Sequence, residues 1–306
     1  MHPEVLLSAG TDVAAVADVL DRIGLDAIVD VHTHFMPKRV MDKVWAYFDG
    51  VGPLVGRPWP IEYRLDEAER VQRLREFGVS AFTSLVYPHK PDMAEWLNSW
   101  ATRFAAQVPE CLHTATFYPE PSAPSYVGRA IEAGARVFKS HIQVGDYPPT
   151  DPLLEPVWAL LEEKQIPTVI HAGSGPAPGR HTGPQPVAEI LRRHPQLRLI
   201  IAHLGLPEYR EFIDLAQRYP GVYLDTTMVF TDFTEQRDPF PPDLRPALGE
   251  LSDKVLFGSD FPNIPYPYQH ALESIVALGL GDQWCRKVFG DNARALFGPI
   301  SALSGD

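Results

Sequence analysis

The chain has 306 residues, of which 45% are hydrophobic and 22% charged, so it can bury a sizeable core and is not a disordered protein. Its 27 Lys and Arg against 39 Asp and Glu give a net charge of −12, which disfavours nucleic acid as a partner. Two widely spaced cysteines, Cys111 and Cys285, exclude a disulfide framework and a zinc finger. Since no signal sequence and no long apolar run is found, we expect a soluble, cytoplasmic protein without a membrane partner.

Eight short apolar runs rich in β-branched residues recur along the chain, each followed by a segment with helical periodicity. The predicted strands are 28–34, 81–87, 111–117, 135–142, 167–172, 198–203, 222–226 and 255–260. A helix is predicted over 12–23, and the helices that follow the strands are 65–77, 92–107, 122–133, 151–164, 185–194, 207–218, 243–251 and 268–278. This alternation is typical of βαβ units around a parallel sheet.

Eight β/α units in one chain most economically close into a (β/α)8 TIM barrel, an α/β fold that binds ligands at the carboxyl ends of its strands. An open doubly wound sheet is the competing architecture, but no Gly-x-Gly-x-x-Gly or Walker-type loop follows any strand. We expect residues 1–306 to form one barrel domain with an N-terminal helix and long loops after strands 1, 5 and 7. These loops are 35–64, 173–184 and 227–242, and 35–64 is the predicted lid or substrate-binding insertion.

Histidines and an aspartate end several of the predicted strands. His32 and His34 lie two residues apart on the first strand, so they share a face and both imidazoles can reach one point. His171, His203 and Asp260 end later strands, at the edge where barrel active sites form. A lone histidine is more often a satisfied core side chain, but the shared position of all five favours a catalytic divalent-metal site.

The segments VDVHTH, VIHAG, IIAHLG and LFGSDFP, with the ending DNARALFG, resemble the amidohydrolase superfamily in their order and spacing. The resemblance is to amidohydrolase family 2, which includes aminocarboxymuconate semialdehyde decarboxylase-like enzymes, and it extends from about Asp26 to Phe297. It implies a barrel with His203 as a catalytic residue and one divalent metal ion held by His32, His34, His171 and Asp260. Nitrogen-rich ligation makes zinc the ion most expected, with manganese, iron or cobalt as alternatives.

Such a site predicts a mononuclear metal-dependent hydrolase. The metal would activate a water molecule for attack on a carbonyl, Asp260 would transfer the proton, and His203 would orient the water or stabilise the oxyanion. The expected substrate is a small cyclic, amide or ester molecule that carries a carboxylate. Two other interpretations stay open: non-oxidative decarboxylation of an aromatic or unsaturated acid at the same metal, and a non-catalytic ligand-binding barrel.

Substrate contacts are expected from the long loops. Arg57 and Arg64 in 35–64, with Arg180 and His181 after strand 5, are candidates for carboxylate capture, although a single arginine is usually a solvated surface charge. Aromatic side chains there either line a pocket for a planar ring or pack the lid onto the barrel. They are Trp45, Tyr47, Phe48, Trp59, Tyr63, Phe230, Phe233 and Tyr266.

The fourth strand carries two further candidates. Lys139 either neutralises a substrate or neighbouring acid or, as in some members of the superfamily, is carboxylated and bridges two metals. His141 shares its face and either contacts substrate or packs behind the site. The resemblance also implies a homodimer, in which Arg210 or Arg237 is a candidate for reaching the neighbouring active site.

Overall fold

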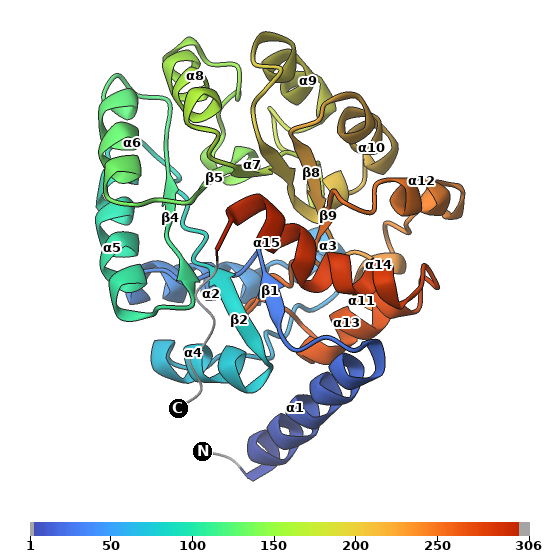
Figure 1. Cartoon of the computed structure of the whole chain (residues 1–306). Helices are drawn as coiled ribbons and strands as arrows, with labels where there is room; N and C mark the ends of the chain where they lie inside the picture. The colour runs from blue at the N-terminus through green and yellow to red at the C-terminus, as the bar shows by residue number, and fades with distance from the viewer. Residues whose placement is uncertain (1–2, 300–306) are drawn as a thin grey trace.

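Parallel strands form a closed ring surrounded by helices in the computed structural model, which describes residues 3–299 and, from residue 12 onwards, their side chains (Figure 1). One sheet contains β1 (Ile28–Asp30), β2 (Val79–Thr83) and β3 (Cys111–Leu112). The other contains β4 (Thr114–Thr116), β5 (Val137–His141), β6 (Thr168–His171), β7 (Leu199–Ile201), β8 (Val222–Asp225) and β9 (Val255–Leu256). The predicted α/β barrel is confirmed.

Two junctions complete the ring. β3 and β4 are successive parts of one barrel strand, because β3 pairs with β2 while β4 pairs with β5. Between β1 and β9, the N–H of Val31 donates to the carbonyl of Phe257 at 2.9 Å, and Thr33 pairs with Phe261. The chain segments that follow β1 and β9 therefore run side by side at the carboxyl end of the barrel.

Helices follow the strands nearly where periodicity predicts them. The N-terminal helix α1 (Pro3–Ile23) packs on α13. The outer helices are α4 (Glu67–Glu76), α5 (Ala94–Gln107), α6 (Ala123–Glu132), α8 (Glu155–Lys164), α9 (Pro184–Arg193), α10 (Tyr209–Arg218), α12 (Arg245–Glu250) and α13 (Tyr268–Val276). Short turns are α7 (Ile142–Gly145), α11 (Asp232–Glu235) and the 3-10 segments η1 (Pro152–Leu154), η2 (Ala202–Gly205) and η3 (Pro242–Leu244). Within the described residues no helix is both long and apolar enough to cross a membrane.

Several predicted bounds differ from the structure. β2 begins and ends earlier than the predicted 81–87: its pairing with β3 ends at Thr83, and beyond it the N–H of Leu85 donates to the carbonyl of Thr33 at 2.9 Å. The segment 35–64 contains α2 (Lys38–Gly50) and α3 (Gly52–Val55) rather than a simple loop. Three elements beyond the last predicted helix were also missed: α14 (Asp282–Arg286), the π-helical η4 (Lys287–Asp291) and α15 (Asn292–Phe297).

The barrel interior is filled by branched apolar side chains and closed at its amino-terminal end by α15. Ala293 and Leu296 of α15 belong to the same cluster as the inward-facing strand residues, and Arg294 donates to the carbonyl of Ala27 at 2.8 Å. The strand residues of this cluster are Val29, Val31, Ala81, Leu112, Val137, Val169, Ile200 and Leu256. Figure 1 shows α15 lying across the ring, so ligand access is left to the opposite end.

A buried carboxylate ties β1 to the loop after β9. Asp30 accepts hydrogen bonds from the hydroxyls of Ser259 at 2.6 Å and Tyr268 at 2.9 Å, and from the N–H groups of His32 and Ser259, both at 3.1 Å. Burial raises the pKa of Asp30 to about 7, against the effect of these donors. Each donor therefore offsets part of the cost of burying this group.

Tyr268→Phe should lower the free energy of unfolding by about 1–3 kcal/mol, because it removes one donor from the buried Asp30 and keeps the ring that stacks on Phe77. Chemical denaturation followed by circular dichroism measures the change. Tyr223→Phe, at a half-buried position of β8, is the matched control and should stay within about 0.5 kcal/mol of wild type. Equal losses in both variants would contradict this role of the Tyr268 hydroxyl.

Candidate metal centre

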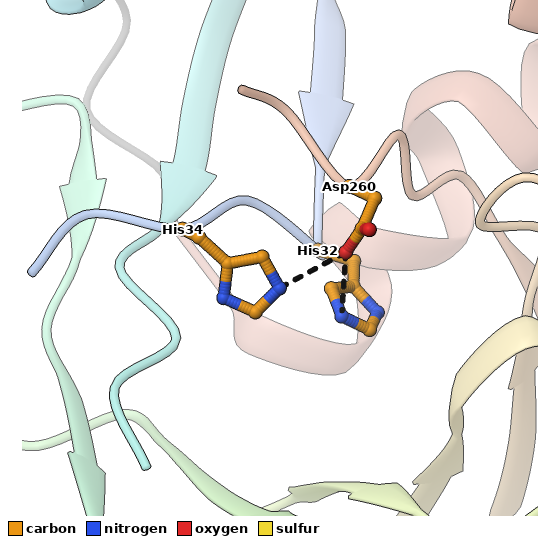
Figure 2. A group of neighbouring side chains, drawn as sticks. All are labelled: His32, His34 and Asp260. Carbon is orange, nitrogen blue, oxygen red and sulfur yellow. Dashed lines mark hydrogen bonds and ion pairs between the residues drawn. The ribbon is translucent and has the colours of Figure 1, made fainter. Parts of the chain in front are cut away.

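His32, His34 and Asp260 converge at the carboxyl end of the barrel (Figure 2). One ligand atom from each lies within 4.8 Å of the others. The Oδ1 of Asp260 is 3.0 Å from Nε2 of His34 and 3.6 Å from Nε2 of His32. All three side chains are buried, and they come from the two segments that close the barrel.

The backbone holds these segments in register. Asp260 donates its N–H to the carbonyl of His32 at 2.9 Å, and His34 donates to Phe261 at 2.7 Å. Asp260 has a φ of 73°, a left-handed conformation that costs a non-glycine residue about 1–3 kcal/mol. Gly258 permits the close approach, since a Cβ there would lie 2.7 Å from the Cβ of His32.

Each of the two histidines has a hydrogen-bond acceptor behind it. Nδ1 of His34 lies 2.9 Å from the carbonyl of Leu85, and Nδ1 of His32 lies 2.9 Å from Oδ2 of Asp225. Both acceptors favour the tautomer with the proton on Nδ1, which leaves the Nε2 lone pair facing Asp260. Burial, followed by the charge of Lys139, holds the pKa of His32 well below its ordinary value, so this ring is neutral.

The donor set fits a divalent cation. Burial alone would raise the pKa of Asp260, but the hydrogen bond and charge of His34, followed by His32 and His203 in their protonated forms, lower it to about 2. An ionised carboxylate oxygen and two imidazole lone pairs repel one another at these distances unless a cation or an extra proton lies between them. Two nitrogens and an oxygen are ligands that zinc and neighbouring transition metals accept.

Asp225, which sequence reasoning missed, organises this group from behind. It is fully buried, and besides His32 it accepts the N–H of His203 at 2.9 Å and the N–H of Thr227 at 3.1 Å on its Oδ1. The Asp225 carboxylate therefore orients two parts of the site. It holds His32, which with His34 and Asp260 forms the group called here the metal cluster, and it holds the turn that carries His203. The available signal was its position, because Asp225 ends a predicted strand at the same edge as the other candidates.

Three more histidines surround the cluster. Nδ1 of His203 faces the carbonyl of Thr227 at 3.0 Å, and its ring centroid lies 5.2 Å from that of His32 and 4.8 Å from that of His171. Nε2 of His171 faces the carbonyl of Gly175 at 2.9 Å, which leaves Nδ1 available for a metal. His141 stacks on His171 with centroids 4.2 Å apart. His171 lies outside the tight group of three described residues, so its role as a fourth ligand stays a prediction.

Lys139 is fully buried beside the cluster, with Nζ 3.3 Å from Nε2 of His32. Burial lowers the pKa of Lys139 to about 8, against the charges of Asp225 and Asp260. Among the described residues, Lys139 is not one of those that line the cavity above the cluster. Direct contact with substrate and carboxylation of this lysine both stay predictions.

The cluster opens into a cavity of about 880 Å³. Its wall includes His141, His171 and His203 from the strand ends and the inner face of α2. Of the predicted aromatic residues, four line it: Tyr47, Phe48, Trp59 and Phe233. The other four, Trp45, Tyr63, Phe230 and Tyr266, are absent from the part of the wall that the structure describes.

The predicted arginines divide in the same way. Arg57 lines the cavity, whereas Arg64 pairs with Asp49 on the outer side of the 35–64 segment. Arg180, which is exposed, and the half-buried His181 are not among the described lining residues. The structure does not bring these last three candidates to the cavity wall.

Arg210 and Arg237, the two candidates for reaching the active site of a neighbouring subunit, lie in different surroundings. Arg210 forms an exposed ion pair with Asp243 at 2.5 Å. Arg237 lines the cavity of its own chain, so it needs no second subunit to reach the site.

The family model described as Amidohydrolase matches residues 29–298. Among solved structures, an uncharacterised TIM-barrel protein from Bordetella bronchiseptica has a TM-score of 0.71 at 19% identity, covering 88% of this chain and 98% of its own. A probable 2-pyrone-4,6-dicarboxylic acid hydrolase from Acinetobacter baumannii, with citric acid bound, scores 0.61 at 13% identity and 90% and 100% coverage. The dihydroorotase of Campylobacter jejuni scores 0.54 at 14% identity and 89% and 83% coverage. No curated protein matches the chain in sequence.

Asp225→Asn should weaken zinc binding by about 10–100-fold, because the amide no longer offers His32 a charged acceptor. Competition with a chromogenic chelator measures the affinity. Asp214→Asn is the matched control, since it makes the same change at an exposed ion pair on α10 and should leave zinc affinity unchanged. Wild-type affinity in Asp225→Asn would show that this carboxylate does not support the metal cluster.

Proposed function

The chain belongs to the amidohydrolase family, and we propose that it is a mononuclear metal-dependent hydrolase of a small, carboxylate-bearing cyclic, amide or ester substrate. The observation that carries this proposal is the convergence of His32, His34 and Asp260 beneath a cavity of about 880 Å³. A closed structural metal site would not need a cavity that admits a small molecule.

The ion would be held by His32, His34 and Asp260, with His171 as the proposed fourth ligand. Zinc suits this set best, although the residues also accept manganese, iron or cobalt. When bound, such an ion supplies a Lewis acid that polarises a carbonyl oxygen and lowers the pKa of water to about 7.

Asp260 and His203 would have different roles in the reaction: proton transfer and orientation of the attacking water. The Asp260 carboxylate is ionised at neutral pH, so it can accept a proton from the attacking water and return it to the leaving group. Burial lowers the pKa of His203, and Thr227 holds the proton on its Nδ1, so its Nε2 is an acceptor. We therefore assign His203 to orienting the water, because the oxyanion role would need a second proton on a buried ring.

The charges of the cavity wall support an anionic substrate. Five basic side chains line it in a chain whose net charge is −12: Arg39, Lys43, Arg57, Lys90 and Arg237. Away from the metal cluster, Asp92 and Asp238 are the acidic residues of the described wall. Such a local reversal of charge attracts anions against the repulsion of the whole molecule.

Decarboxylation stays a second candidate because part of the wall is aromatic. Trp59 lies between Phe48 and Phe233, with ring centroids 4.9 and 4.7 Å away, and all three line the cavity. This surface suits a planar unsaturated acid.

The reaction class is tested with a panel of carboxylated lactones, cyclic amides, N-acyl amino acids and benzoic acids. The zinc-reconstituted protein should hydrolyse at least one ester, followed as acid release in a pH-stat, or at least one amide, followed by the amino group that appears, and chelation should abolish the reaction. Release of CO2 from an unsaturated acid, without hydrolysis of any ester or amide, would show that the protein is a decarboxylase and not a hydrolase. Loss of both activities, with no zinc retained after reconstitution, would leave a ligand-binding barrel.

Asp260→Asn should reduce turnover of any hydrolysed substrate by about 10²–10⁴-fold, since an amide cannot accept the proton. Steady-state kinetics give the loss, and metal analysis of the same sample separates it from a loss of zinc. Asp243→Asn on the surface is the control and should keep wild-type turnover. Near wild-type rates in Asp260→Asn at full zinc occupancy would exclude Asp260 from proton transfer.

A further inference from the structure

Arg57 is a cation in the cavity wall without a carboxylate partner. It follows α3, and its guanidinium lies 3.7 Å from the ring centroid of Phe233. Its Nη1 donates to the amide oxygen of Gln236 at 2.9 Å. Among the described residues no Asp or Glu forms an ion pair with it. The positive charge of Arg57 is therefore available to bind an anionic ligand that enters the cavity.

A second arginine lies close enough to act on the first. Burial, followed by the charge of Arg237, lowers the pKa of Arg57. Arg237 lies just beyond α11, donates to the carbonyl of Pro176 and pairs with the neighbouring Asp238 at 3.0 Å. Asp238 pairs with Arg237 alone, so among the described residues the two guanidinium groups have one carboxylate partner between them, and an anion that binds both would relieve their mutual repulsion.

The wall behind Arg57 holds it in place before any ligand arrives. Phe233 packs against Trp59 with ring centroids 4.7 Å apart, so the guanidinium stacks on a supported ring. A planar fork that is already oriented loses little further entropy when it binds a carboxylate. The other basic residues of the wall, Arg39, Lys43, Lys90 and Arg237, are exposed, where water competes for their charge. Of these, Arg237 is held in place by its contacts with Pro176 and Asp238.

We propose that Arg57 and Arg237 form an anion subsite for the carboxylate that the substrate carries besides its scissile carbonyl, remote from the bond that is cleaved. Both residues line the same cavity as His32, His34 and Asp260. Hydrolysis at the metal cluster would then yield a product with one carboxylate at the cluster and another at the arginines. The inference rests on the proposed function for the reaction, but the subsite itself is open to a binding test.

Isothermal titration of the zinc-reconstituted protein with three aromatic acids provides this test. Benzoate carries one carboxylate, whereas isophthalate and terephthalate carry a second one at two positions across the same ring. We expect at least one dicarboxylate to bind about tenfold or more tightly than benzoate, because a charged hydrogen bond contributes about 1.5–3 kcal/mol. Arg57→Met should reduce this preference to less than about threefold.

Two variants serve as controls. Arg64→Met changes an arginine of the same 35–64 segment that pairs with Asp49, and it should keep the full preference for the dicarboxylate. Arg57→Lys keeps the charge without the fork and should restore part of the preference. The subsite is excluded if neither dicarboxylate binds more tightly than benzoate to wild type, or if the preference survives in Arg57→Met.

The outcomes separate this inference from the proposed function. A preference that depends on Arg57, together with no hydrolysis of any panel member, would overturn the hydrolase and keep the subsite. Hydrolysis at equal rates of matched substrates with and without a carboxylate, together with equal binding of the three probes, would keep the hydrolase and overturn the subsite.

Discussion

The ring of strands closes where β1 meets β9, and the candidate metal site of His32, His34 and Asp260 is built on this closure. His32 and His34 leave β1 beside the segment that carries Asp260, with main-chain hydrogen bonds crossing between them. A barrel that closed one residue out of register would turn the paired histidines away from the carboxylate, because neighbouring strand residues face opposite sides. The hydrogen bonds of Asp30 to Ser259 and Tyr268 stabilise the same junction from within the protein. The fold and the site therefore both depend on the contact between the first and last strands of the ring, β1 and β9.

The two buried carboxylates near the closure, Asp225 and Asp30, are tolerated because each accepts several hydrogen bonds from fixed partners. Asp225 receives one imidazole and two main-chain N–H groups, and Asp30 receives two hydroxyls and two N–H groups. Lys139 has no such set of acceptors, and burial lowers its pKa accordingly. The left-handed conformations of His203 and Asp260 add backbone strain in the same small region. Buried charged groups and left-handed backbone conformations that occur together in one small region are typical of a functional site.

The sequence predicted the barrel and the side chains of the cluster for a simple reason. Strand periodicity is local, and the His-x-His spacing places both rings on one face whatever the loops do. Asp225 was missed although it lies at the end of a predicted strand, because its contact with His32, 193 positions away, is seen only in the folded chain. The 35–64 segment was expected as a loop, although it contains α2, and only Arg57 of its two arginines reaches the cavity. Loop side chains depend on tertiary packing, and for that reason the substrate contacts were the weakest part of the prediction.

Asn263 connects the two ends of the proposed substrate site. Its N–H donates to the carbonyl of Asp260 at 2.8 Å, while its side-chain oxygen accepts from Trp45 at 3.1 Å and its carbonyl from Trp59 at 2.7 Å. Both tryptophans belong to the 35–64 segment, and Trp59 also supports the ring on which Arg57 stacks. The turn that carries Asp260 and the wall that carries Arg57 are thus joined through one buried residue. Such a connection would fix the span between the candidate metal site and the proposed anion subsite, so substrates would be selected by the distance between the reacting carbonyl and the carboxylate that they carry.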